Sequence, residues 1–308
     1  MVRQRSAKPL FAGSIPAVAS SFPTPRNFSF PSTVESHGWY RLAPFRWSPK
    51  ERVLRRREAL STGIVELEIR LRRGKLVVAG AEPTPELERR IGRMFQLHVD
   101  TTGFHELARE SERHAWVEEA GFGRLLCGST LWEDAVKIIA TTNTTWRQTV
   151  RMVDLLVTKT GRDGAFPDPA DVIRFSEEEL QRDCRLGYRA KTMRALAAGI
   201  VDGSIDLAAV ADPNQTTDRL YRSFLTLPGI GPYGSAHLLA MEGRHDYIAV
   251  DTEFRRHVRE TYHRGRKVSD RAMLRRYAKW GKWKYLAYWS ELWNSVADSL
   301  QSEADGGT

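Results

Sequence analysis

Residues 227–233 read Leu-Pro-Gly-Ile-Gly-Pro-Tyr, and on either side lie segments with the apolar spacing of helices, 216–225 and 233–241. Gly229 and Gly231 permit a tight turn between these helices, because glycine adopts a positive φ without a steric penalty. The backbone N–H groups of such a turn point outward at the start of the second helix, which suits a phosphate group. The stretch therefore predicts a hairpin of two helices with an anion-binding corner.

Composition restricts the class of protein. The chain has 308 residues, of which 41% are hydrophobic and 28% charged, as in a soluble globular protein with one large or two ordinary domains. The net charge of +9 favours polyanionic partners. No apolar run reaches the roughly 18 residues of a membrane span. Cys127 and Cys184 are too few for a four-cysteine iron–sulfur cluster, and their isolation predicts a reducing, intracellular setting.

The N-terminal part of the chain changes character near residue 27. Residues 1–26 contain no acidic residue and are rich in Ser, Ala, Pro and Arg, which is typical of a disordered basic tail or of an organellar targeting peptide. Residues 27–114 include stretches that alternate apolar and charged side chains, which predicts a small antiparallel sheet. The expected strands cover 37–42, 52–55, 64–71 and 76–78, and two expected helices cover 85–94 and 102–108.

From about residue 115 the apolar period becomes helical, and Gly and Pro separate the segments. Residues 301–308 are expected to form a second disordered tail. The fold class is therefore predicted to be α+β, with a predominantly α-helical domain, 115–300, preceded by the sheet domain, 27–114. Besides the hairpin, the expected helices cover 132–140, 146–157, 176–183, 190–201, 206–210, 253–262, 270–277 and 285–297.

The hairpin and its surroundings resemble a known family. The apolar run 248–250 ends in Asp251, and residues 185–191 read Arg-Leu-Gly-Tyr-Arg-Ala-Lys. Together with the hairpin, these features resemble the helix-hairpin-helix (HhH-GPD) DNA glycosylases, closest to the branch of 8-oxoguanine glycosylase and bacterial alkyl-adenine glycosylase. The resemblance covers most of residues 115–300 by motif and the sheet domain by pattern alone.

The resemblance implies a DNA anchor at the hairpin. The N–H groups of Gly229, Gly231 and Tyr233 would hold one DNA phosphate in a contact that does not depend on base sequence. Carbonyl oxygens of the Leu227–Gly231 hairpin would ligate a monovalent cation. Arg255 and Arg256 would bind further phosphates, although a solvated basic face explains them nearly as well.

Asp251 matches the catalytic carboxylate of this family. Breaking an N-glycosidic bond builds positive charge on the sugar, and a nearby carboxylate stabilises that charge. It can also orient or deprotonate the attacking water. The competing interpretation is an N-cap, because Asp251 precedes Thr252 and Glu253 at an expected helix start.

Tyr233 decides which reaction the resemblance implies. Family members that also cleave the strand carry a lysine at this position, and its amine attacks the sugar. Tyrosine cannot form that Schiff base, so a hydrolytic, monofunctional enzyme is implied. Tyr233 would instead stack on an extruded base, in a sandwich with Trp283 and beside Trp146, a pocket that favours cationic alkylated purines. The competing interpretation is that these aromatic side chains only fill the core.

Asn143 lies in a small polar stretch between two expected helices. By resemblance it would fill the gap that a flipped nucleotide leaves in the duplex, whereas a helix-capping loop is the competing interpretation. Tyr188 and Arg189 are expected to be structural.

We therefore predict a monomeric DNA glycosylase without an iron–sulfur cluster that acts on damaged double-stranded DNA inside the cell, on alkylated purines of the 3-methyladenine type. The alternatives are an 8-oxoguanine-type glycosylase with lyase activity and a non-catalytic DNA-binding module.

Overall fold

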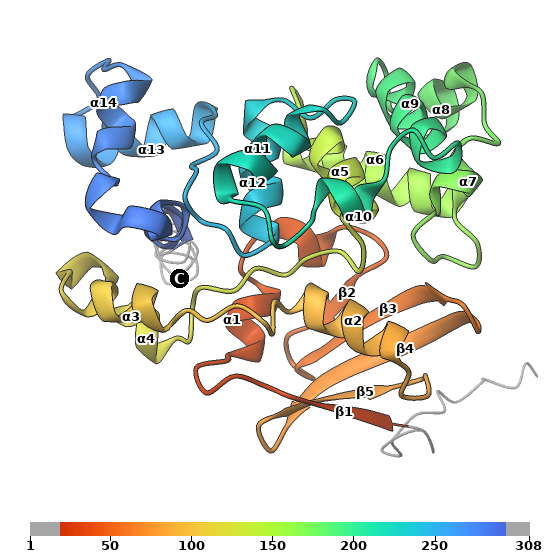
Figure 1. Ribbon diagram of the computed structural model, residues 1–308, viewed down its shortest axis with the longest axis horizontal. Coiled ribbons are helices and arrows are strands. Elements are labelled where there is room, and N and C mark those ends of the chain that lie inside the picture. The colour runs from red at the N-terminus through yellow and green to blue at the C-terminus, as the bar shows by residue number, and fades with distance from the viewer. Residues whose placement is uncertain (1–18, 294–308) are drawn as a thin grey trace, which may run out of the picture.

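The computed structural model describes residues 19–293, which form a sheet on one side and a larger group of helices on the other (Figure 1). The sheet has five antiparallel strands in the order β1-β5-β4-β3-β2. The strands are β1 (Ala19–Pro23), β2 (Arg46–Ser48), β3 (Val53–Leu60), β4 (Gly63–Arg72) and β5 (Lys75–Ala79).

The sheet forms because its strands alternate buried and exposed side chains. In β4, Leu67 and Ile69 are fully buried, and Ile69 pairs with Val78 of β5. Helix α2 (Pro85–Met94) belongs to the same core through its buried Leu87 and Ile91. The sequence therefore predicted an antiparallel sheet correctly and located three of its strands, β3, β4 and β5.

Helices make up most of the remaining chain. The short N-terminal helices are α1 (Phe30–Val34) and the 3-10 helix η1 (Gly38–Arg41). Next come α3 (Thr102–Arg109), η2 (Glu112–His114), α4 (Trp116–Glu119), α5 (Leu131–Thr141), α6 (Trp146–Thr160), α7 (Pro169–Val172) and α8 (Glu177–Asp183). The C-terminal part contains α9 (Arg189–Val201), α10 (Leu207–Val210), α11 (Thr217–Leu225), α12 (Pro232–Met241), α13 (Thr252–His263), α14 (Asp270–Arg275), η3 (Ala278–Trp283) and a final helix from residue 284 to the last described residue, 293.

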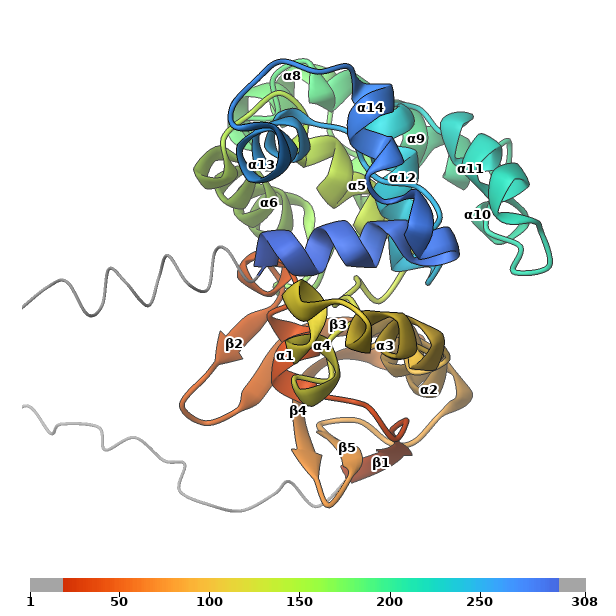
Figure 2. The same cartoon turned by 90° about the vertical axis from the view of Figure 1, so that its left-hand side faces the viewer.

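Two hydrophobic cores cross the domain boundary expected at residue 114. One core joins the sheet to α5, α6, α9 and α12. The other joins side chains of α3 and α4 to α13, α14 and the final helix. Figure 2 shows that final helix (blue) between α3 and α4 on one side and α12, α13 and α14 on the other. In space, α3 therefore packs with the C-terminal helices. The expected division into a sheet domain, 27–114, and a helical domain, 115–300, stays a prediction.

A buried ion cluster joins the sheet to the helices. Arg56 of β3 forms an ion pair with Glu133 of α5 at 2.9 Å, and Lys137, one turn further along α5, donates to the same carboxylate at 2.6 Å. All three side chains are almost completely buried. Such a cluster is costly to disrupt, because each charge depends on its partners for compensation.

Three local predictions were wrong or incomplete. Residues 37–42 form no strand, because the side chain of His37 caps the 3-10 helix η1 by accepting from the Trp39 N–H. Residues 19–23, expected in the disordered tail 1–26, form β1 and pair with β5. The short strand β2 was not predicted. The expected tails at 1–18 and 301–308 lie outside the described residues.

The predicted α+β fold class is confirmed. In the part of the chain from 19 to 293, none of the helices combines the length and apolar character needed to cross a membrane.

Candidate active site

A cavity of about 520 Å³ brings several predicted site residues together. Its walls come from the N-terminal segment around η1, from α5, α6 and α12, from the start of α13 and from the final helix. Asp251, Tyr233 and Trp146 all line it. These residues lie far apart in sequence, so the cavity exists only in the folded chain.

Asp251 is at once a helix cap and a lining residue of the cavity. Its Oδ1 atom accepts a hydrogen bond from the Phe254 N–H at 2.7 Å, which caps α13. Partial burial raises the pKa of the Asp251 carboxyl above its ordinary value, and the nearby Glu253 carboxylate adds to the rise. The two interpretations of the sequence are therefore compatible.

Tyr233 lies on the first turn of α12 beside a histidine that sequence reasoning missed. The Tyr233 ring contacts the His237 ring edge-to-face at a centroid separation of 4.5 Å. The His237 Nδ1 atom is 3.2 Å from the Tyr285 hydroxyl. Burial lowers the pKa of His237 to about 4. This wall of the cavity is therefore aromatic and uncharged at neutral pH.

The N-terminal segment supplies a second wall, from His37, Gly38 and Trp39. Gly38 lies against the Trp146 indole so closely that a Cβ atom there would come within 2.4 Å of the ring. The indole Nε1 of Trp39 donates to Asp134 of α5 at 2.8 Å. Neither contact has a local sequence signal, because each partner lies far along the chain.

Trp283 is not brought to this cavity, so the expected Tyr233–Trp283 sandwich is absent from the structure. Trp283 packs against Phe104 and stacks on His245, with ring centroids 6.1 and 5.8 Å apart. The final helix instead presents Tyr285 and Trp289, whose rings stack at 5.6 Å. Helical spacing in the sequence identified the C-terminal aromatic cluster. It did not show which face of the final helix lines the cavity.

The hairpin has the expected shape with one difference. Gly229 has φ of 80°, and a Cβ there would lie 2.1 Å from Thr192, so glycine is required. Gly231 has an ordinary φ of −93°, and a Cβ there would meet open space. Gly231 is the N-cap of α12 but has no side chain to cap it. The helix start is therefore exposed, uncapped and open to a close-approaching ligand.

Asn143 lies on an exposed loop next to the cavity rather than in its lining. Its φ is 46°, and its Nδ2 donates to the hydroxyl of Tyr188 at 3.2 Å. Arg189 is buried and binds the carbonyl oxygens of Thr142 and Asn143, as expected of a structural residue. Tyr188 is 59% exposed and therefore does not serve as a packing anchor.

Arg255 and Arg256 are already paired with carboxylates. Arg255 binds Asp270 through two contacts of 2.8 Å each. Arg256 binds both Glu253 and Glu260. These exposed pairs would have to open before either arginine could bind a phosphate, and the predicted phosphate contacts of Arg255 and Arg256 stay a prediction.

The cavity has an unusual charge balance. Among the residues that the structure describes, its lining contains two carboxylates, Asp251 and Glu253, and no lysine or arginine. The aromatic lining consists of Trp39, Trp146, Tyr233, Tyr285 and Trp289. The site therefore combines negative charge with electron-rich ring faces.

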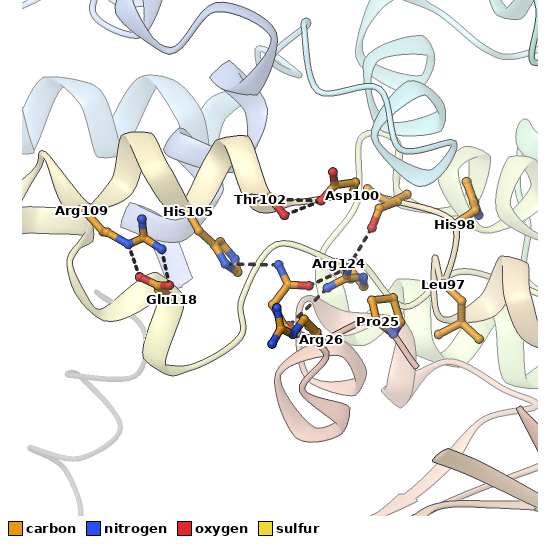
Figure 3. Close-up of a pocket in the computed structure, with 12 residues that line it drawn as sticks. Pro25, Arg26, Leu97, His98, Asp100, Thr102, His105, Arg109, Glu118 and Arg124 are labelled. Atoms are coloured by element: carbon orange, nitrogen blue, oxygen red, sulfur yellow. Dashed lines mark hydrogen bonds and ion pairs between the residues drawn. The ribbon is translucent and has the colours of Figure 1, made fainter. Parts of the chain in front are cut away.

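A second cavity, of about 570 Å³, lies between the segment 25–27, the loop before α3 and Arg124 (Figure 3). Its polar groups bind one another. Arg109 pairs with Glu118, and Arg124 donates to the carbonyl oxygen of Val99 at 2.8 Å. The candidate active site is the other cavity, which Asp251 lines. Nowhere in residues 19–293 do three or more His, Cys, Asp or Glu side chains gather as a metal site.

Comparison with known proteins places this geometry in a family. Residues 136–282, which include the hairpin and Asp251, match the model of the HhH-GPD superfamily base excision DNA repair protein. No curated protein matches the chain.

The fold is shared with solved structures of DNA glycosylases, three of which follow. The 8-oxoguanine glycosylase/lyase of Clostridium acetobutylicum, in complex with DNA, has 16% identity and a TM-score of 0.69, covering 89% of this chain and 93% of its own. The 3-methyladenine DNA glycosylase of Archaeoglobus fulgidus has 15% identity and a TM-score of 0.71, covering 90% and 98%. MBOgg1, in complex with a low-affinity DNA ligand, has 18% identity and a TM-score of 0.70, covering 90% and 97%.

The structures of both enzyme branches therefore superpose over most of this chain, including the sheet. The part of the chain from 136 to 282 therefore matches the HhH-GPD superfamily of base excision DNA repair proteins, and this match together with the shared fold supports a DNA N-glycosylase.

Proposed function

We propose that this protein hydrolyses the N-glycosidic bond of an extruded alkylated purine and leaves the DNA strand uncut. The observation that carries the proposal is the cavity lining: carboxylate and aromatic side chains, with no lysine or arginine among the described residues. Each part of this composition supports one part of the proposed reaction.

The aromatic and acidic lining favours a cationic base. Alkylation at a ring nitrogen gives a purine a positive charge, which aromatic faces attract. Asp251 and Glu253 add negative charge near the same space. Burial keeps His37 and His237 neutral by lowering their pKa values to about 3 and about 4, so neither repels a cationic base. An uncharged oxidised purine would gain less from these surroundings.

Asp251 supplies the chemistry of bond cleavage. As the base departs, positive charge develops on the sugar, and the ionised carboxylate stabilises it. The same carboxylate can orient the water that attacks the anomeric carbon. The N-cap hydrogen bond from Phe254 fixes the carboxylate in position, which preserves this arrangement between turnovers.

The absence of an amine nucleophile supports a monofunctional reaction. Strand cleavage through a Schiff base requires a lysine amine at the sugar. Tyr233 occupies the hairpin position where strand-cleaving relatives carry that lysine. Lys137, on the adjacent helix α5, is fully buried and bound to Glu133, so it is not available as a nucleophile.

The exposed start of α12 and the loop at Asn143 provide the proposed DNA contacts. Free N–H groups at an uncapped helix start suit a phosphate, and open space at Gly231 allows the backbone of DNA to approach closely. Asn143 would fill the vacated position in the duplex. A monovalent cation fits the Leu227–Gly231 turn by the chemistry of its carbonyl oxygens, which are hard ligands.

A lesion panel tests the proposal. The full-length protein is incubated with duplexes that carry single 3-methyladenine, 7-methylguanine or 8-oxoguanine residues, and released base and strand nicking are measured with and without alkali. We expect release of alkylated purines and nicking only after alkali. Nicking without alkali would establish a lyase activity. Preferential release of 8-oxoguanine would identify the protein as an 8-oxoguanine-type glycosylase. Binding without any base release would reduce the protein to a DNA-binding module.

A further inference from the structure

A third cavity, of about 750 Å³, lies between the sheet and α6. Its lining includes two aspartates, Asp154 and Asp163, and five arginines, which come from η1, β2, β3 and the first two turns of α6: Arg41, Arg46, Arg57, Arg147 and Arg151. We call this cavity the arginine groove. Its lining carries an excess of positive charge, whereas the cavity at Asp251 contains carboxylates and neither lysine nor arginine among the described residues.

Three of these guanidinium groups have no carboxylate partner. Within residues 19–293, Arg41, Arg57 and Arg147 form no ion pair, and all three are exposed. Arg57 donates to a neutral acceptor, the carbonyl oxygen of Asp163, at 2.6 Å. The charges of these three arginines are therefore available to an anionic ligand.

The other two arginines of the groove form exposed ion pairs. Arg46 pairs with Glu66, and Arg151 approaches Asp154 at 3.6 Å. The four side chains are between 47% and 62% exposed, and ion pairs in such surroundings are weak because water and salt screen them. An anion in the groove can therefore compete for both arginines.

Helix stability does not account for the arginines of α6. Arg147 lies in the first turn, where the helix dipole favours acidic side chains, and this turn holds none. Arg151 follows one turn later, and like charges at this spacing repel each other. Both penalties decrease when an anion binds, so ligand binding explains a charge that the fold does not.

The arginine groove continues from the wall of the active-site cavity. Gly38 of η1 lies against the Trp146 indole, and both residues line the cavity at Asp251. Arg41 lies at the other end of η1, and Arg147 directly follows Trp146, so the groove begins where that wall ends. Figure 2 shows α6 and β2 on the same side of the molecule, with α2 on the opposite side of the sheet. A duplex that places a base in the cavity therefore brings its backbone close to the groove.

We propose that the arginine groove binds the sugar–phosphate backbone of the DNA on one side of the damaged base. The inference rests on the proposed function only in taking damaged DNA as the ligand. Guanidinium groups form paired hydrogen bonds with phosphate oxygens, and a row of them suits successive phosphates of a strand. The sheet side of the protein therefore adds DNA contacts to those proposed at the start of α12 and at Asn143. Phosphates bind at the groove, while the acidic, aromatic cavity receives the base.

The arginines of η1 and α6 that form no ion pair provide the test. In Arg41→Gln/Arg147→Gln, two positive charges are lost and no buried partner is left behind. In Arg41→Lys/Arg147→Lys, both charges are retained. As a control, Arg72→Gln/Arg89→Gln removes two exposed arginines of β4 and α2 that form no ion pair within residues 19–293 and line neither the arginine groove nor the cavity at Asp251.

Fluorescence anisotropy with an abasic duplex measures the dissociation constant over a series of salt concentrations. We expect Arg41→Gln/Arg147→Gln to bind about 5- to 20-fold more weakly at about 0.1 M salt, and the slope of log K against log salt to fall by about 2 in magnitude, since each lost phosphate contact reduces it by roughly 1. The lysine variant should keep the slope of the wild type, and the control variant should bind within about twofold of the wild type. An affinity and a slope that match the control, or an equal loss in the lysine variant, would overturn the inference.

Shortened duplexes locate the contact. Removing base pairs stepwise from one side of the abasic site or from the other takes away the flanking phosphates in turn. On one side only, the difference between wild type and Arg41→Gln/Arg147→Gln should disappear below a defined length, as in a double-mutant cycle. A difference that persists in every shortened duplex, or that disappears equally from both sides, would overturn a contact with one flank of the lesion.

The same measurements separate this inference from the proposed function. Binding to an abasic duplex requires no base release, so a wild type that releases no alkylated purine but loses affinity on Arg41→Gln/Arg147→Gln refutes the proposed reaction alone. Release of alkylated purine by the wild type, together with unchanged binding by that variant, refutes the inference alone.

Discussion

Asp251 combines a structural contact of the fold with the catalytic role that we propose for it. Its side chain caps α13, and the same carboxylate borders a cavity lined with aromatic rings. Burial raises the pKa of Asp251, which means that folding disfavours the charged form. A partly buried carboxyl with a raised pKa in a cavity supports the catalytic role that we propose for Asp251.

We predict that Asp251→Asn does not lower thermal stability at pH 7. Because the folded-state pKa is raised, ionised Asp251 destabilises the fold above its ordinary pKa of 3.8, and this effect disappears as pH falls and the group is protonated. Asparagine is neutral and keeps the cap acceptor. Thermal melts of both proteins at pH 7 and pH 4 test this. A markedly lower melting temperature for the variant at pH 7 would show that the carboxylate is mainly structural.

The pH profile of base release should also carry the signature of Asp251. The reactive form is the carboxylate, so the acidic limb of kcat/KM should have its midpoint above 3.8. His237 has a pKa of about 4, and its protonation adds positive charge in the same cavity. The acidic limb of kcat/KM should therefore fall more steeply with pH than the protonation of one group would produce. A single-proton limb at or below 3.8 would contradict this account.

At the level of elements, the hairpin combines a glycine that the fold requires with one that it does not. Gly229 has a positive φ and no room for a Cβ, whereas Gly231 has an ordinary φ and faces open space. The fold therefore accounts for the presence of glycine at position 229. At position 231, the close approach of a ligand to the helix start would account for it.

The two glycines provide a matched pair of variants. Gly229→Ala should lower the free energy of unfolding by about 1–3 kcal/mol, because of strain and the contact with Thr192. Gly231→Ala should change it by less than about 0.5 kcal/mol but weaken binding to an abasic duplex. Urea unfolding and fluorescence anisotropy measure the two quantities. Unchanged DNA affinity in Gly231→Ala would show that the phosphate does not bind at the start of α12.

Periodicity predicted most elements but not how they meet. The helix at 85–94 and the hairpin helices were located closely, since each has a clear apolar face and end signals. Residues 37–42 were misread as a strand, because the alternation there arises from a capped 3-10 helix. Helical spacing found the C-terminal aromatic cluster, yet only the packed structure shows that Trp289 and not Trp283 reaches the cavity. Local patterns carry no information about such distant contacts.

For the whole molecule, the sheet and the helices behave as one unit around the active site. The N-terminal segment contributes one wall of the cavity, and indole hydrogen bonds from Trp289 and Trp293 attach the final helix to that segment. The buried Arg56–Glu133–Lys137 cluster adds a polar connection between β3 and α5. The sheet domain therefore shapes the site instead of serving only as an appendage.

Removing one carboxylate from that cluster should destabilise the whole molecule. Glu133→Gln leaves the buried Lys137 without its ion-pair partner and Arg56 with Glu58 as its remaining buried carboxylate, and we expect a loss of about 3–5 kcal/mol in urea unfolding. As a control, Glu51→Gln breaks an exposed pair with Arg55 and should unfold close to the wild type. A loss below about 1 kcal/mol for Glu133→Gln would show that water or rearrangement compensates the cluster.

The central claim is that Asp251 drives hydrolytic release of an alkylated purine without strand cleavage. Single-turnover release from a duplex with one 7-methylguanine, compared between wild type and Asp251→Asn, tests it most directly. We expect release by the wild type with no nick before alkali, and at least about 100-fold slower release by the variant at similar affinity for an abasic duplex. Equal release by the two proteins, or a nick formed by the wild type before alkali, would contradict it.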